Sequence, residues 1–191
     1  MTPLVKAYGT DVGVEVTSLA VQVHGGMGYV EEIGAAQHYR DARISPIYEG
    51  TNGIQAADLV GRKIGLAGGE AVKRLLAQIR DEAARHTGVT DLADACERVA
   101  GRLLTASDDD RLAASYPFLT MLAVTVAGWL MERQNFAAEF EEPPSDFRSM
   151  KLAATDFYLN QVVPEALGLE DAATASASVL YAVSEEAFAA A

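Results

Sequence analysis

Apolar residues recur every three or four positions along almost the whole chain, and this spacing restricts the fold more than any other feature of the sequence. Such a period places apolar side chains on one face of an α-helix, whereas a half-buried β-strand alternates apolar and polar residues. No segment shows a convincing alternation, and no internal repeat is visible. We therefore predict an all-α protein.

Glycines, prolines and charged runs divide this pattern into separate helices. In the first third, the predicted helices cover residues 4–24, 31–43 and 54–64. Beyond them, predicted helices cover residues 69–86, 90–106 and 147–163, and a further helix carries an apolar seam from Leu112 to Leu130. Gly68 and Gly69 mark the predicted domain boundary, because consecutive glycines interrupt helices. The two predicted domains are residues 1–66 and residues 67–191.

The segments between the helices give further expectations. The run Asp108–Asp110 is predicted to be a connecting turn whose charges favour the positive end of a following helix. Pro117 either lies in the first turn of its helix or kinks it. Residues 141–146 are predicted to form a loop, and an alanine-rich tail is predicted after Pro164.

The first predicted helix has a broad apolar stripe that needs a partner. The stripe consists of Val5, Val12, Val16, Leu19, Ala20 and Val23. Large exposed apolar surfaces drive association. We therefore expect either a homo-oligomer or packing of residues 4–65 against residues 66–191.

The formal net charge of −12 argues against some classes of partner. An acidic chain repels nucleic acid and anionic membranes, so we expect neither as a partner. The charge is concentrated in residues 66–191, which hold twenty acidic and ten basic residues, so chemistry is expected in the more balanced residues 1–65. The single cysteine, Cys96, cannot form an intrachain disulfide, which fits a cytoplasmic protein. The sequence shows neither an apolar run of about 18 residues nor a signal-peptide pattern.

Two of three short motifs between residues 22 and 62 are ambiguous on their own. Gln22–Gly28 holds three glycines in four residues, which permit positive φ and the close approach of a phosphate to the backbone. The simpler interpretation is a glycine helix end. Arg40–Ile44 is a charged helix end, where local ion pairs contribute only about 0–1 kcal/mol.

The third motif, Ile47–Gln55, contains a candidate catalytic base. Glu49 lies between Tyr48 and Gly50, with apolar Ile47 and Ile54 nearby, and partial desolvation raises the basicity of a carboxylate. The glycine leaves open space for a substrate. An exposed glutamate at a helix start, favoured by the helix dipole, remains the alternative.

The order and spacing of the three motifs resemble the acyl-CoA dehydrogenase family. The family patterns Ala-x-Gln-x-x-Gly-Gly-x-Gly, Arg-Asp-Ala-x-Ile and Ile-Tyr-Glu-Gly-Thr-x-x-Ile-Gln stand here at Ala20–Gly28, Arg40–Ile44 and Ile47–Gln55. The resemblance covers residues 4–65. The rest of the chain is similar to the extra C-terminal helical domain of some larger bacterial members, such as the 3-methylmercaptopropionyl-CoA dehydrogenases.

The resemblance implies a fold and a reaction. The fold would be the last helices of the family's C-terminal four-helix domain, followed by an additional helical bundle. Glu49 would remove the α-proton of an acyl-CoA thioester while a hydride passes from the β-carbon to FAD, giving a trans-2-enoyl-CoA. The expected electron acceptor is an electron-transfer flavoprotein.

The resemblance also implies roles for individual residues. Gly50 would lie beside the substrate thioester. Arg40 and Arg43 are expected to hold the helix–loop geometry rather than bind substrate. Contacts to FAD are implied for Gln22, Val23, His24, Gly25 and Gly26, toward a neighbouring subunit, and for Thr51, Asn52 and Gly53. Thr51 or Asn52 is also expected to cap the helix that follows.

The chain departs from the family pattern in extent, because the parts that cover the flavin and most of the acyl-CoA are missing. We therefore expect this chain on its own not to bind FAD stably and not to turn over substrate. The alternative is a non-catalytic helical module that assembles subunits. An unrelated helical protein with a chance match and the acyl-CoA oxidase branch are two further alternatives, and the identity of the acyl chain is open.

Overall fold

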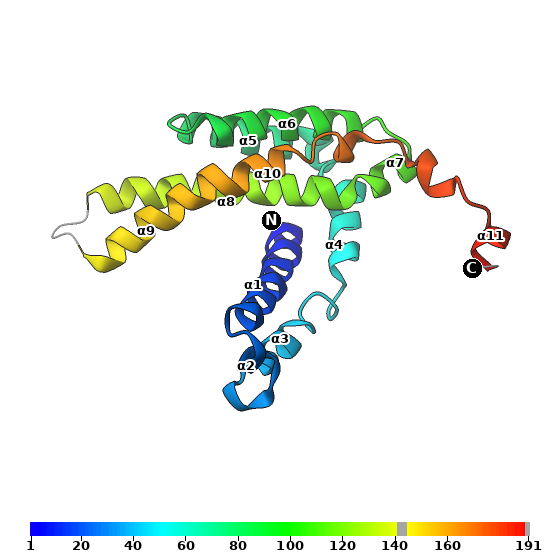
Figure 1. Ribbon diagram of the computed structural model, residues 1–191. Helices are drawn as coiled ribbons and strands as arrows, with labels where there is room; N and C mark the ends of the chain where they lie inside the picture. The colour runs from blue at the N-terminus through cyan, green and yellow to red at the C-terminus, as the bar shows by residue number, and fades with distance from the viewer. Residues whose placement is uncertain (141–144, 190–191) are drawn as a thin grey trace.

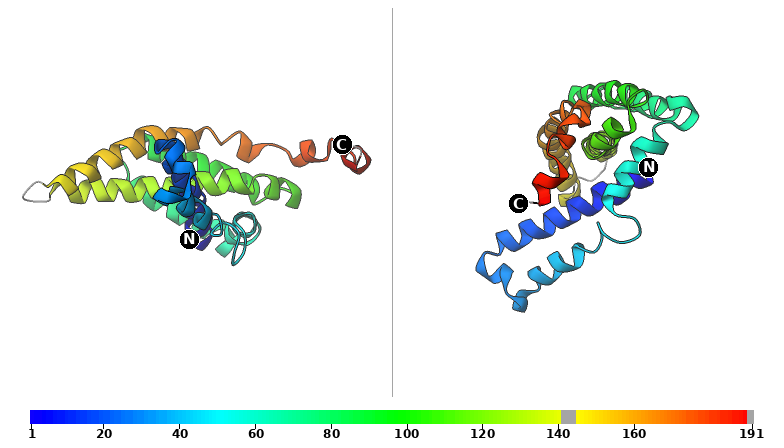
Figure 2. Two further views of the ribbon diagram at one scale, coloured as in Figure 1. Left: turned by 60° about the horizontal axis from the view of Figure 1, so that its bottom comes forward. Right: turned by 90° about the vertical axis from the view of Figure 1, so that its right-hand side faces the viewer.

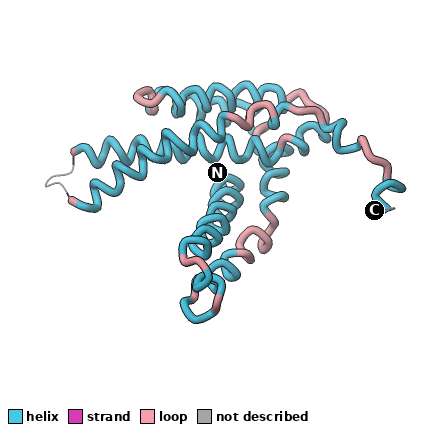
Figure 3. The backbone as a smooth tube through the Cα atoms, viewed as in Figure 1, coloured by secondary structure: helices cyan, strands magenta, loops and turns pink. Residues whose placement is uncertain are grey.

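The computed structural model describes residues 1–140 and 145–189, which form helices and turns without a β-strand (Figure 1, Figure 3). The all-α prediction is confirmed. The longer helices are α1 (Gly9–Val23), α3 (Ala35–Ala42), α4 (Asn52–Asp58), α5 (Glu70–Glu82), α6 (Thr87–Leu103), α7 (Asp108–Ala113), α8 (Ser115–Glu139) and α9 (Asp146–Phe157). The shorter elements are η1 (Leu4–Tyr8), α2 (Gly26–Tyr29), η2 (Glu31–Ile33), η3 (Leu59–Lys63), η4 (Leu66–Gly69), η5 (Tyr158–Val162), α10 (Val163–Leu167), η6 (Ala172–Thr174), η7 (Ala177–Tyr181) and α11 (Glu185–Ala189).

Helices α1 and α3 form a hairpin that projects from a bundle made by the remaining long helices (Figure 1). The helix predicted over residues 4–24 is confirmed, as η1 continuing into α1. The helix predicted over residues 31–43 begins too early, because Gly34 adopts a φ of 79° and separates a single 3₁₀ turn, η2, from α3. This left-handed conformation suits glycine and interrupts a right-handed helix.

Helix α4 and the π-helical turn η3 lead from the hairpin back into the bundle. They confirm the helix predicted over residues 54–64. Of the two candidate caps, Thr51 is the one that acts: its Oγ1 accepts a hydrogen bond from the backbone amide of Ile54 at 3.3 Å. Gly68 and Gly69 have φ values of 67° and 92°, so the chain turns sharply there before α5.

Helix α8 lies at the centre of the bundle, with α6, α9, α10, α4 and η1 packed around it (Figure 2, right). The apolar seam predicted from Leu112 to Leu130 is found in part, because Leu119, Ala123 and Val126 are buried. The seam is not the whole of the buried surface, since α8 is buried on several sides over its middle turns, and Leu112 lies on α7. A helix that is apolar all round belongs inside a core. Leu112 and Leu130, at the ends of the seam, are each 51% exposed. Pro117 lies in the first turn of α8, where it removes no helical hydrogen bond.

The prediction that Asp108–Asp110 form a connecting turn is wrong. These residues are the first turn of α7, because Ser107 Oγ caps the helix by accepting a hydrogen bond from the amide of Asp110 at 3.1 Å. The expected match between their charge and the positive end of a helix is confirmed. The Asp110 carboxylate also accepts a hydrogen bond from the amide of Ala177 at 2.8 Å, which holds the C-terminal tail and lowers the pKa of Asp110.

The helix predicted over residues 147–163 is longer than expected. Helix α9 continues through η5 into α10, and Pro164 lies near the start of α10 instead of ending the helix. In the tail beyond it, η6 packs against α6 and α8, η7 contacts α7, and α11 lies away from the bundle (Figure 1). The loop predicted over residues 141–146 falls largely outside the described residues, and the described Ser145 caps α9.

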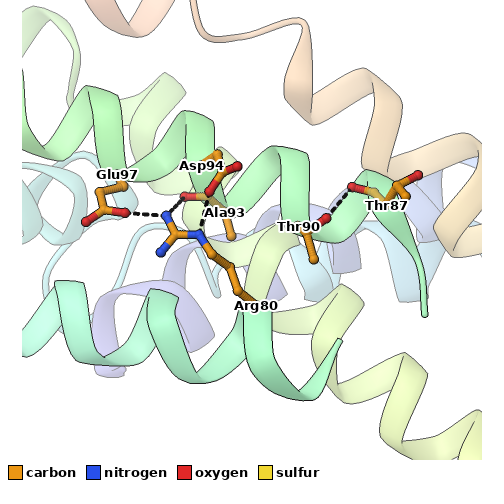
Figure 4. A network of polar contacts seen from close by, with 6 residues as sticks. All are labelled: Arg80, Thr87, Thr90, Ala93, Asp94 and Glu97. Atoms are coloured by element: carbon orange, nitrogen blue, oxygen red, sulfur yellow. Dashed lines mark hydrogen bonds and ion pairs between the residues drawn. The ribbon is translucent and has the colours of Figure 1, made fainter. Parts of the chain in front are cut away.

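A cluster of charged residues joins α5 to α6 (Figure 4). The guanidinium of Arg80 on α5 donates hydrogen bonds to the carboxylates of Asp94 and Glu97 on α6. Thr90 Oγ1 donates to the carbonyl of Thr87 at 2.8 Å in the first turn of α6. The hydrogen bonds from Arg80 to the two carboxylates fix the register of α5 and α6 at the bundle surface.

One apolar cluster spans both predicted domains. It includes the fully buried Ala56 and Val60 from the first and Leu76 and Phe118 from the second. The division into residues 1–66 and 67–191 stays a prediction. Cys96 is also in this cluster, and burial raises the pKa of its thiol to about 12, so it is held as an unreactive thiol.

Glu132 on α8 gives the fold a pH dependence. Its Oε1 atom is buried and accepts no hydrogen bond from a described residue. Burial raises the pKa of this carboxyl from 4.5 to about 7, an effect that Arg85 partly opposes. Because the folded pKa lies above the unfolded one, the stability that the neutral form contributes is present below pH 4.5 and is lost as the pH rises through about 7.

We therefore expect Glu132→Gln to stabilise the protein at pH 8 but hardly at pH 5. The gain in the free energy of unfolding is about 1 kcal/mol, which allows for solvent screening of a partly exposed group. Urea unfolding at the two pH values measures it. The matched control is Glu165→Gln on α10, an exposed position where a change below about 0.5 kcal/mol is expected at both pH values. Equal effects of Glu132→Gln at both pH values would contradict this account.

Candidate functional site

The loop between α3 and α4 holds Glu49 in an unusual backbone conformation. The backbone amide of Asn52 donates to the carbonyl of Pro46 at 3.0 Å and closes the loop. Within it, Glu49 has a φ of 52° and Gly50 a φ of 85°. A left-handed conformation is costly for a residue with a side chain, by about 1–2 kcal/mol, and such strain is concentrated at functional sites.

The side chain of Glu49 is exposed. The apolar neighbours expected to shield it, Ile47 and Ile54, are 53% and 61% exposed. The partial desolvation expected for Glu49 is therefore not found, and its exposure agrees with the alternative of an exposed glutamate before a helix start. The space beside Gly50 is limited on one side by Gln55, whose Nε2 would lie 3.2 Å from a Cβ atom at Gly50.

Asn52 anchors the end of the loop to the start of the first helix. Its side chain is only 4% exposed, and its Nδ2 donates hydrogen bonds to the carbonyl of Ala7 at 3.0 Å and to Asp11 Oδ1 at 2.8 Å. Lys6 Nζ donates to Asn52 Oδ1 at 2.8 Å. The side-chain amide and the backbone N–H of Asn52 are thus both engaged within the chain.

The glycine motif forms the turn at the far end of the α1–α3 hairpin. Gln22, Val23, His24, Gly25 and Gly26 are all exposed. Gly25 has a φ of 60° and a ψ of −143°, a conformation available almost only to glycine, and a Cβ atom there would meet nothing within 4 Å. Gly28, by contrast, packs so tightly that a Cβ atom would lie 2.3 Å from the carbonyl oxygen of Val21. The motif is both a helix end and an open backbone surface.

A groove of about 600 Å³ lies next to this turn, and the sequence interpretation did not include it. The groove is lined by Val21, Tyr29, Val30, Glu31, Glu32, Ala36, Tyr39 and Arg40. Arg40 donates two hydrogen bonds to the Glu31 carboxylate, at 2.8 and 2.9 Å, and the pair fixes η2 against α3. The prediction that Arg40 holds the local geometry agrees with this contact.

The structure does not bring the two candidate cofactor segments together. Gln22–Gly26 precedes α3 and Thr51–Gly53 follows it, and the eight residues of α3 span about 12 Å. Figure 1 shows the glycine turn near the tip of the hairpin and the Glu49 loop nearer the bundle. The two segments would therefore contact different parts of a ligand or different ligands. That Gln22–Gly26 faces a neighbouring subunit stays a prediction.

Two family models match the chain. The one described as "Acyl-CoA dehydrogenase, C-terminal domain" matches residues 1–64, and the one described as "Acetyl-CoA dehydrogenase C-terminal like" matches residues 69–184. The chain belongs to the acyl-CoA dehydrogenase family. The resemblance stated from the three motifs is confirmed.

Similar proteins extend well beyond this chain. A 3-methylmercaptopropionyl-CoA dehydrogenase from Ruegeria pomeroyi is 40% identical over 86% of this chain and 31% of its own length. A butyryl-CoA dehydrogenase from Syntrophomonas wolfei is 33% identical over 97% of this chain and 33% of its own length. The chain thus spans about a third of the length of these relatives.

A solved structure shows the same fold. The crystal structure of an acyl-CoA dehydrogenase complexed with FAD from Bacillus anthracis matches 97% of this chain and 34% of its own, with a TM-score of 0.62 and 18% identity. Within residues 1–140 and 145–189, no helix is both long and apolar enough to cross a membrane. The same residues contain no group of acidic, histidine and cysteine side chains suited to a metal ion.

Apart from the buried Asn52, the residues for which the resemblance implies FAD contacts form an exposed surface, and no described residue encloses it. Gly25 and Gly26 expose backbone with open space above it, so a polar group of the cofactor can approach closely. Thr51 and Gly53 are exposed at the start of α4. Enclosure of a flavin ring needs further surfaces.

Proposed function

We propose that this chain supplies the catalytic base of a flavoenzyme that converts acyl-CoA thioesters to trans-2-enoyl-CoA. The observation that carries the proposal is the closed loop that holds Glu49 at a φ of 52° beside a glycine. Strain of this kind is kept where it positions a functional group. Membership of the acyl-CoA dehydrogenase family and the names of the relatives support the reaction class.

In the proposed reaction, the Glu49 carboxylate takes the α-proton of the thioester. The electron pair of the broken C–H bond forms the new double bond, and the hydride leaves from the β-carbon. FAD, when bound, accepts this hydride, and an electron-transfer flavoprotein is the proposed acceptor of its electrons. Gly50 leaves the space in which the thioester lies next to the base.

The chain also contributes to holding the cofactor in this proposal. The exposed turn Gln22–Gly26 contacts FAD of a neighbouring subunit, and Thr51, Asn52 and Gly53 contact FAD beside the base. His24 is exposed and free to donate or accept a hydrogen bond there.

Flavin reduction tests the proposal. The isolated chain is expected to purify without flavin and without dehydrogenase activity, because Glu49 and its apolar neighbours are uncovered. A full-length polypeptide carrying this chain is expected to bind FAD and to lose its visible flavin absorbance on anaerobic addition of a saturated acyl-CoA. Full-length protein that binds FAD but is reduced by none of a short-, medium- and long-chain series would refute the function.

A second candidate function, subunit assembly, is favoured by the exposed stripe on α1. The stripe does not pack against the bundle: Val16 and Leu19 are each 56% exposed and Val23 is 84% exposed. We expect these residues to bind a second copy of the chain. Leu19→Glu should then shift light scattering toward monomer, whereas the control Glu15→Gln on the same helix should not. A wild-type chain that is monomeric at high concentration would exclude this candidate.

A further inference from the structure

A chain of hydrogen bonds connects the start of α8, at the surface of the bundle, to the Glu49 loop. The hydroxyl of Tyr116, in the first turn of α8, donates to Asp11 Oδ2 on α1. The other carboxylate oxygen, Oδ1, accepts a hydrogen bond from Asn52 Nδ2 at 2.8 Å. Asn52 follows Glu49 by three positions in the sequence. Three segments that are distant in sequence thus meet at one asparagine.

The side chain of Asn52 is held in place by several hydrogen bonds. Asn52 is buried, and both polar atoms of its side chain are satisfied, by the carbonyl of Ala7, by Asp11, by Thr10 and by Lys6. Burial and the neighbouring Asp11 carboxylate raise the pKa of Tyr116 to about 12, so its hydroxyl stays protonated and able to donate at neutral pH. Asn52 is the buried and fully satisfied member of the network, and such satisfaction rigidifies the groups that it joins. The Tyr116–Asp11 hydrogen bond attaches this member to α8 at the protein surface.

The same asparagine also closes the loop through its backbone. Its amide donates to the carbonyl of Pro46 at 3.0 Å, across the segment that contains Glu49 and Gly50. The side chain therefore fixes the residue whose main chain holds the loop together. Loss of the side-chain anchor frees the end of the loop and lets Glu49 relax from its left-handed conformation.

We propose that Tyr116 is a positioning residue for Glu49, acting through Asp11 and Asn52 to fix the closed loop that carries the base. The inference rests on the proposed function and deepens it, because it gives the helical bundle a part in the reactive site. Tyr116 does not touch substrate or cofactor in this account. Its effect is on the precision with which the base is held.

Hydrogen exchange of the isolated chain tests the positioning without any activity. Tyr116→Phe is expected to accelerate exchange of the amides in residues 47–53 about tenfold, the size expected for loss of a hydrogen bond to a charged group. Tyr181→Phe is the matched control, because Tyr181 also meets a carboxylate, that of Asp109, on another part of the bundle. Exchange of α6 amides reports global stability. Unchanged exchange in the loop, or acceleration equal to that in α6, overturns the proposal.

Kinetics of the full-length flavoenzyme provide the second readout. Per bound flavin, Tyr116→Phe is expected to lower kcat about fivefold and leave KM within about twofold, because orientation of the base changes and substrate contacts do not. A purely structural role would lower flavin content and leave kcat per flavin unchanged, and that result overturns the proposal. Failure of the wild-type enzyme to reduce flavin with any acyl-CoA refutes the proposed function instead, and faster loop exchange in Tyr116→Phe would still show that the loop is anchored from α8.

Discussion

Glu49→Gln is expected to lower turnover of the full-length flavoenzyme by about 10²- to 10⁴-fold, the range typical for removal of a general base. Glutamine has nearly the shape of glutamate and cannot take a proton, so the loop and the FAD content should be retained. The measurement is the rate of anaerobic flavin reduction by acyl-CoA, normalised to bound flavin. A rate within threefold of wild type would remove Glu49 from the mechanism.

Two further variants separate the chemical role of Glu49 from its structural one. Glu49→Gly also removes the carboxylate, but glycine adopts a φ of 52° at little cost, so this variant should be inactive and about 1 kcal/mol more stable. Glu32→Gln changes an exposed glutamate of the same hairpin and should leave the rate unchanged. Inactivity of Glu32→Gln would point to a general effect of charge on the hairpin.

Features that depend on neighbours in the sequence were predictable. The helix boundaries at Thr51 and at the paired Gly68 and Gly69 follow from capping chemistry and from glycine backbone freedom. The motif Ile47–Gln55 indicates Glu49 as the candidate base and Gly50 as its neighbour. The helices predicted over residues 69–86 and 90–106 are found as α5 and α6, because each has one apolar face and one polar face.

Features that depend on contacts across the fold were not predictable. The spacing from Leu112 to Leu130 predicts one apolar face, but packing from several directions buries residues on all sides of the middle turns of α8. The link from Tyr116 through Asp11 to Asn52 spans up to 105 positions, and no local pattern marks it. The sequence predicts Asn52 as a helix cap or a cofactor contact, whereas its side-chain amide joins the start of α4 to the first helix.

The central position of α8 also predicts how the chain unfolds. Phe118 is fully buried on α8, within the apolar cluster that contains residues from both sides of Gly68 and Gly69. Phe118→Ala is expected to lower the free energy of unfolding by about 3–5 kcal/mol, through lost burial and the cavity left behind. For a chain of 191 residues the fall in Tm is about 10 °C.

The loss should appear in both parts of the chain at once. If α4 and η1 depend on α8 for their core, hydrogen exchange in residues 52–63 and in α6 should accelerate by the same factor in Phe118→Ala, and thermal unfolding should keep a single transition. The control is Phe188→Ala on α11, where the side chain is 69% exposed and a change within about 0.5 kcal/mol is expected. Two separate transitions, with residues 52–63 unaffected by Phe118→Ala, would show instead that residues 1–66 fold as a unit of their own. That outcome would also weaken the positioning role of Tyr116, because a loop that folds independently of α8 does not need an anchor on it.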